Sequence, residues 1–188
     1  MNISRRNFLA GAGAIGVSVA VTGCKYPPSD EKGRKIGVGV GGATGLVLDA
    51  CGLDDESRNA TIEIVTGIGT TTPQEGETIE QCWTRIAEET VKRLQEAGKL
   101  TPAQAAAVLA AFKLVIKAWQ ILEERHPEVK AWCSFTVSVV NGFCTGFLAV
   151  YKPANCNGGC DEGCCEIDMQ AYKALQTTAE AKALGFGK

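Results

Sequence analysis

Residues 101–126 read TPAQAAAVLAAFKLVIKAWQILEERH, and this stretch decides the fold. Thr101, Pro102 and Gln104 form a helix start, because threonine caps the first turn, proline suits the first position and glutamine bonds back to the cap. Apolar residues then recur at three- and four-residue steps, which predicts one buried face: Ala105, Val108, Leu109, Phe112, Val115, Ile116, Trp119 and Leu122. The opposite side is polar and carries Lys113, Lys117, Gln120 and Glu124. Pro127 ends the helix.

The segment before this helix predicts a second one of the same kind. Its start lies either at Thr72, where Gly76 interrupts the pattern, or at Thr78 with Gln81 as capping partner. One face is largely apolar and carries Ile79, Cys82, Trp83, Ile86, Thr90 and Leu94. Gly98 and Thr101 lie so close together that we expect an antiparallel hairpin. The predicted fold is mainly α, a small helical bundle built on the hairpin Thr78–His126.

Residues 131–151 carry no charge and are open to three interpretations. As a helix they place four small residues on one stripe, namely Ser134, Ser138, Gly142 and Gly146. As strands they alternate in polarity and then reach Asn141-Gly142, which is typical of a β-hairpin spanning 133–151. As a membrane span they have the right length and flanking aromatic residues. We predict a buried helix and keep the β-hairpin as an alternative.

Four glycines at intervals of four, Gly33, Gly37, Gly41 and Gly45, form the second undecided stretch. On a helix they would make a smooth stripe that another backbone can approach closely. This pattern resembles the glycine zippers of some envelope lipoproteins, and the resemblance implies self-association. A glycine-rich loop or strand is an equal alternative, because each helical glycine costs about 1 kcal/mol relative to alanine.

The last helix is predicted over Asp168–Leu184, where Ala171, Ala174 and Leu175 share an inner side with Thr178 and Ala179. Gly185 followed by Phe186 fits a C-terminal cap with its hydrophobic contact. We therefore expect one continuous helix to close the domain.

The first 24 residues form an export-signal pattern with charged residues followed by an uncharged apolar run. Arg5 and Arg6, followed by Phe8-Leu9, resemble the twin-arginine translocation motif, and Val21-Thr22-Gly23-Cys24 resembles a lipobox. This resemblance to bacterial exported lipoproteins implies that residues 1–23 are removed and that Cys24 receives lipid. Cys24 would then attach the protein to a membrane of the cell envelope, the outer membrane being favoured in a Gram-negative source. Residues 24–35 would be anchor and spacer, and residues 36–188 a single domain.

The chain has nine cysteines, so eight remain when Cys24 is set aside. An even number of cysteines in an exported chain predicts disulfides. The candidates are Cys51, Cys82, Cys133, Cys144, Cys156, Cys160, Cys164 and Cys165. The last four lie within ten residues, and an alternative is that they hold an iron–sulfur cluster or another metal, which twin-arginine export would deliver already loaded. Their spacing matches neither ferredoxin runs nor paired zinc ligands, so disulfides are the prediction.

Charge and histidine content limit the classes of function. The chain has 19 basic residues, of which Arg5 and Arg6 lie in the signal, so 17 remain against 21 acidic ones, a net charge of −4. A mildly acidic domain without a basic stripe is a poor nucleic-acid binder. The single histidine, His126, lies in the last turn of its helix, where we expect it to interact with the helix dipole. We therefore predict a non-enzymatic envelope interaction or scaffold protein, with a redox accessory protein as the alternative.

Overall fold

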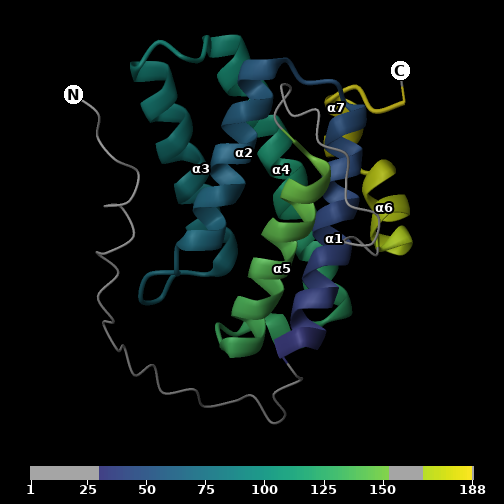
Figure 1. Ribbon diagram of the computed structural model, residues 1–188. Coiled ribbons are helices and arrows are strands. Elements are labelled where there is room, and N and C mark those ends of the chain that lie inside the picture. Colours follow the sequence, from purple (N-terminus) through teal and green to yellow (C-terminus); the bar gives the residue numbers. More distant parts are fainter. Residues whose placement is uncertain (1–29, 153–166, 188) are drawn as a thin grey trace, which may run out of the picture.

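The computed structural model describes residues 30–152 and 167–187 as a mainly helical protein without strands in those ranges (Figure 1), which confirms the predicted class. The export-signal residues, Cys24 and the tail cysteines lie outside these ranges. Seven α-helices and one 3-10 helix follow one another within 30–152 and 167–187: α1 (Asp30–Ala50), α2 (Asp55–Thr70), α3 (Ile79–Glu96), α4 (Pro102–Arg125), η2 (Pro127–Lys130), α5 (Ser134–Val150), α6 (Met169–Gln176) and α7 (Ala179–Ala183).

The glycine-rich segment forms the central helix of the molecule, α1. Every residue from 37 to 48 is buried except Leu46, which is half-buried. In Figure 1, α1 runs beside α5, and it also contacts α4 and α6. A helix that is apolar all round is stable only when neighbours cover it, and here they do. The loop-or-strand alternative for the four glycines is therefore wrong.

α1 and α5 make the most extensive helix contact among the described elements. Gly37 lies against the carbonyl of Val139, and Gly41 against the carbonyl of Phe143. A step of four residues along α1 thus matches a step of four along α5 in the same direction, so the two helices run parallel. A Cβ atom at either glycine would lie 2.0 Å from that carbonyl oxygen, which no real structure tolerates. The stripe lets the two backbones approach closely, and α5 of the same chain fills it.

The β-hairpin alternative for 133–151 is wrong, because residues 134–150 form the single helix α5. Asn141-Gly142 does not turn the chain: Gly142 instead packs on the backbone of α1, where its Cβ would lie 2.2 Å from the carbonyl oxygen of Arg34. Tertiary packing has overridden a local turn signal.

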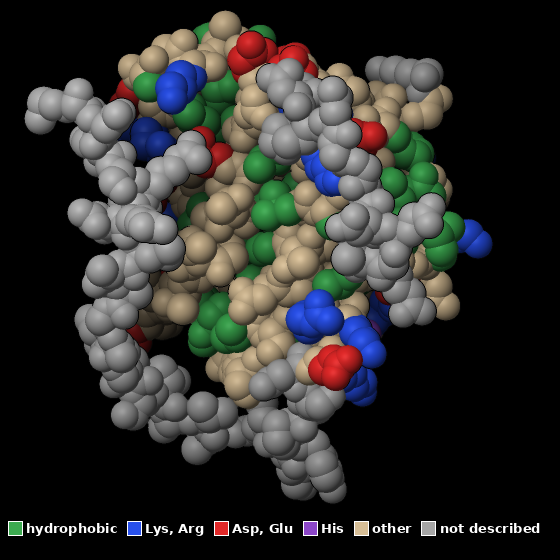
Figure 2. Space-filling view, in the orientation of Figure 1, with side chains coloured by type: hydrophobic (Ala, Val, Ile, Leu, Met, Phe, Trp, Pro, Cys, Tyr) green, Lys and Arg blue, Asp and Glu red, His purple; other side chains and the backbone are tan. Residues whose placement is uncertain are grey.

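Figure 2 shows the face of the molecule on which α5 lies, where charged side chains surround an uncharged centre over this helix. In the described part, only α4 is long and apolar enough to cross a membrane, and half of its most apolar window is buried in the fold.

The starts of α3 and α4 confirm the predicted capping signals. Thr78 and Gln81 form a capping box, so α3 begins there rather than at Thr72. Thr101 and Gln104 form the same arrangement at the start of α4. Between them, Gly98 has a φ of 67° and ends α3. The indole rings of the two helices meet in the core, with the centroids of Trp83 and Trp119 4.8 Å apart.

The C-terminal segment differs from the single helix that was predicted. It breaks into α6 and α7 because Thr178 caps a new helix, its hydroxyl accepting the amide of Ala181. The predicted Gly185 cap is present, since Gly185 has a φ of 97° and the amide of Phe186 bonds to the carbonyl of Ala181 at 3.0 Å. Local threonine chemistry therefore outweighs the apolar periodicity that suggested continuity.

Candidate interaction groove

A surface groove lies where α3, α4 and α7 meet, and it has a volume of about 410 Å³. We call it the α3–α4–α7 groove. Its lining residues are Thr84, Ala87 and Glu88 of α3, Leu109, Phe112, Lys113, Ile116, Lys117 and Gln120 of α4, and Glu180 of α7.

The floor of the groove is the edge of the apolar face of α4. Phe112 is buried there, whereas Leu109 and Ile116 are only half-buried. These residues follow one another at steps of three and four, so they lie on one side of the helix. The apolar face is wider than the core can cover, and its margin is left at the surface.

The walls of the groove carry charges that do not pair with one another. Lys113 and Lys117 lie one turn apart on α4, and Glu88 and Glu180 come from α3 and α7. Within the described ranges none of the four forms an ion pair, and the nearest polar contact of Lys117 is its ammonium 3.5 Å from the side-chain oxygen of Gln120. Both signs of charge therefore remain available to a visiting molecule.

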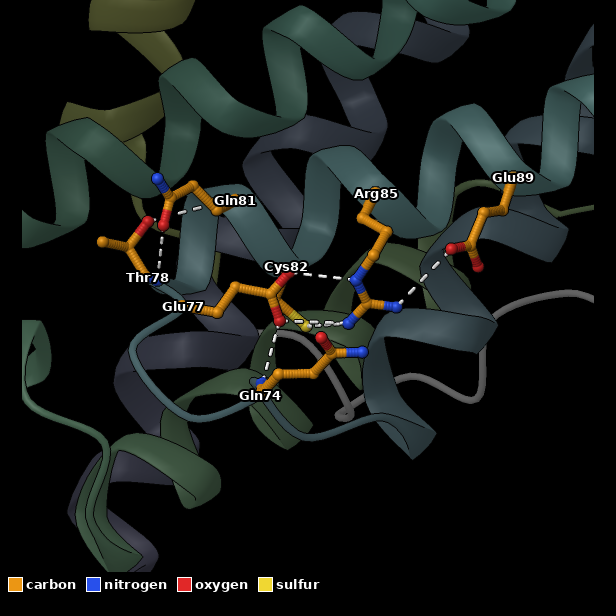
Figure 3. Close-up of polar contacts among 7 residues, drawn as sticks. All are labelled: Gln74, Glu77, Thr78, Gln81, Cys82, Arg85 and Glu89. Atoms are coloured by element: carbon orange, nitrogen blue, oxygen red, sulfur yellow. Dashed lines mark hydrogen bonds and ion pairs between the residues drawn. The ribbon is translucent and has the colours of Figure 1, made fainter.

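Apart from the groove, a cluster of polar residues fixes the loop that precedes α3 (Figure 3). The guanidinium of Arg85 donates two hydrogen bonds, each of 3.0 Å, to the carboxylate of Glu77, which also accepts the Gln74 amide at 2.9 Å. These bonds lower the pKa of Glu77 to about 2. The Cys82 sulfur lies 3.8 Å from the same guanidinium, but burial raises the pKa of this thiol. Arg85 of α3 holds the carboxylate of the loop residue Glu77, so the cluster acts as a structural latch between this loop and α3.

The four described candidate cysteines form no disulfide with one another. Cys51 is half-buried after α1, Cys133 precedes α5, and Cys144 lies within α5. Burial raises the pKa of the Cys51 thiol and raises that of Cys144 to about 12. A thiol must lose its proton to attack or to bind metal, so burial disfavours both reactions at these two positions.

The remaining predicted site residues lie outside the described ranges. They are Arg5, Arg6, Cys24, Cys156, Cys160, Cys164 and Cys165. Disulfides between the tail and the four described cysteines therefore stay a prediction, as does the metal alternative. His126 is the C-terminal cap of α4, and its imidazole Nδ1 lies 3.4 Å from a carboxylate oxygen of Glu128.

Arg58 and Tyr151 form another polar contact, which joins α2 to the end of α5. The guanidinium carbon of Arg58 lies 4.6 Å above the centre of the Tyr151 ring, and an Nη atom of Arg58 bonds to Asp49 at 2.7 Å. The Tyr151 hydroxyl is buried without a hydrogen-bond partner among the described residues, and burial raises its pKa to about 12. The contacts of Arg58 therefore join α2 to the end of α1 and to the end of α5.

Sequence reasoning missed the groove, although part of its signal was present. Leu109 and Ile116 widen the apolar face of α4, and the paired lysines lie beside them. The contribution of Glu180 had no local signal, because α7 reaches α4 only through the tertiary fold. No protein-family model, curated protein or solved structure matches this chain. An apolar floor within charged walls is suited to a protein partner, since interface cores are apolar and their rims polar.

Proposed function

We propose that the chain is an exported lipoprotein, held in a membrane of the cell envelope by lipid at Cys24, that acts as a non-enzymatic interaction or scaffold protein. The twin-arginine pattern at Arg5 and Arg6 and the lipobox ending at Cys24 support export and anchoring. In a Gram-negative source the proposed location is the outer membrane. The expected partner is another envelope protein and not a nucleic acid.

The α3–α4–α7 groove is the observation that carries this function. It combines half-buried Leu109 and Ile116 with charged side chains that form no ion pairs in the described part. Apolar side chains left at the surface beside a hollow are typical of binding sites. Other half-buried apolar residues lie on the described surface, but the groove joins two of them to four charged side chains without ion pairs in that part of the chain.

The finer architecture belongs to the same proposal. The domain from residue 36 to 188 is a bundle built on an antiparallel hairpin of α3 and α4, tied by disulfides between the tail cysteines and the rest of the fold. The short connection Ala97–Thr101 and the contact of Trp83 with Trp119 support the hairpin. Cross-links of this kind would stabilise the mature chain outside the reducing cytoplasm. Since burial disfavours the thiolates of Cys51 and Cys144, a bond to either one would form before that side chain is buried.

A photo-cross-linking experiment tests the proposed function. The full chain is produced with a photoreactive amino acid at Gln120, on the rim of the groove, and is irradiated in intact cells. We expect a cross-linked product in the membrane fraction that is lost with Leu109→Glu, because a charge on the floor repels an apolar partner. Ala106→Glu, an exposed position on the same helix outside the groove, is the matched control and should retain the product. Equal cross-linking by both variants, or a hydrolase or transferase activity of the purified chain, would overturn the proposal.

A further inference from the structure

We propose that the α3–α4–α7 groove binds an amphipathic helix of another protein, and that this helix carries two carboxylates one turn apart which pair with Lys113 and Lys117. This inference rests on the proposed interaction function and names the chemistry of the partner. It is argued from the length of the groove, the pattern of its floor and the charges on its walls.

The length of the groove matches a short helix. Its lining residues on α4 run from Leu109 to Gln120, which at 1.5 Å per residue corresponds to about 17 Å. That distance is about three turns of helix. The floor residues Leu109, Phe112 and Ile116 fall on successive turns, as do the anchor residues of a helix that lies in a groove.

The charges select the polar side of the partner. Lys113 and Lys117 project from successive turns of α4, and neither has a carboxylate within ion-pair distance in the described part of the chain. Two carboxylates at positions i and i+4 of a visiting helix have the same spacing. Glu88 and Glu180 on the walls from α3 and α7 disfavour acidic residues on the other flank. The site therefore favours a helix whose acidic flank faces α4.

A second copy of the chain does not supply such a helix from its described residues. The apolar faces of α2 and α3 are buried within the fold, the exposed margin of the α4 face lines the groove itself, and the glycine stripe of α1 is filled by α5. The one large hydrophobic residue exposed in the described part, Met169, stands alone on α6. Since the described residues of a second copy do not offer this helix, the proposal commits to a segment of a different protein as the occupant.

The test uses the full chain and a pair of synthetic peptides. Each peptide is a hydrocarbon-stapled, fluorescent helix of about 14 residues with leucines on one face. One carries two glutamates one turn apart on its flank, and the other carries two lysines at the same positions. We expect the glutamate peptide to bind about tenfold more tightly by fluorescence anisotropy, as two surface ion pairs would produce.

Charge reversal in the protein locates the effect. K113E/K117E should invert the preference for the two peptides, whereas K99E/K173E, which changes the net charge equally at exposed positions outside the groove, should leave it unchanged. Circular dichroism checks that both variants keep their helical content. Equal binding of the two peptides, no binding, or a preference unaffected by K113E/K117E would overturn the inference. If groove-dependent cross-linking in cells persists in that case, the proposed function stands and only the partner chemistry is wrong.

Discussion

Glu77 shows how one side chain fixes a loop to the helix that follows it. Its carboxylate is bound by the Arg85 guanidinium and the Gln74 amide, and these bonds lower its pKa from 4.5 to about 2. A carboxylate whose pKa is lower in the folded state stabilises the fold above its unfolded pKa. That contribution is present above about pH 4.5 and disappears as the pH falls toward 2.

Glu77→Gln should therefore lower the thermal midpoint at neutral pH, because the amide cannot form the same ion pair with Arg85. Thermal unfolding monitored by circular dichroism from pH 2 to 7 measures the effect. The difference between the variant and the unchanged chain should shrink as the pH approaches 2. Glu75→Gln, an exposed position in the same loop, is the control and should show no such difference. A pH-independent difference at Glu77 would contradict the latch.

Tyr151→Phe should stabilise the protein by about 1 kcal/mol, since it removes a buried hydroxyl that has no hydrogen-bond partner in the described part of the chain and keeps the ring beneath Arg58. The raised pKa adds an alkaline test. Because the pKa of Tyr151 is raised from 10.0 to about 12, the unchanged chain should lose stability as the pH rises from 10 toward 12, whereas the phenylalanine variant lacks this loss. Urea unfolding across this range measures both effects. A less stable variant would show that the hydroxyl has a partner after all.

At the scale of elements, the contact of α1 with α5 depends on the absence of side chains. Gly37→Ala should destabilise the protein by about 3 kcal/mol, because the new methyl group would meet the Val139 carbonyl oxygen at 2.0 Å and the helices would have to separate. Gly42→Ala on the same helix is the matched control. Its Cβ would meet Ile167 at 3.6 Å, an ordinary contact, and the higher helix propensity of alanine should favour the variant by about 1 kcal/mol. Urea unfolding measures the free energy of unfolding of both variants. Equal changes in that free energy would contradict the close packing of α1 on α5.

Elements with strong local signals were the ones that sequence predicted well. Thr78 and Thr101 begin α3 and α4 through capping boxes, whose residues lie three apart in the chain. Asn141-Gly142 favoured a β-hairpin that does not form, because Gly142 packs on the backbone of α1 within a continuous helix. Continuity of the last helix also failed, since Thr178 starts α7. Capping interactions between residues close in the chain can therefore be predicted from the sequence. The outcome of a competition between a local turn signal and a contact distant in the sequence cannot.

At the scale of the molecule, the pairing of α1 with α5 is the feature that sequence could not predict. The glycine stripe and the small-residue stripe were both visible, but nothing in either showed that the two segments pack against each other. The groove also depends on contacts between segments that lie far apart in the sequence. α4 supplies the floor through its own periodicity, while Glu88 and Glu180 reach it only because α3 and α7 pack beside α4. The packing of helices that are distant in the sequence therefore determines both the core and the candidate site.

The intact mass of the chain purified from cells tests the central claim, that this is an exported, lipid-anchored and cross-linked protein. The sample comes from the membrane fraction and is alkylated in denaturant without reduction, so that buried free thiols also react. We predict a chain that begins at Cys24, carries the added mass of lipid there, and takes up no alkylating agent at the other eight cysteines. A soluble chain that retains Met1 and is alkylated at its cysteines, or a brown protein containing iron, would contradict the account.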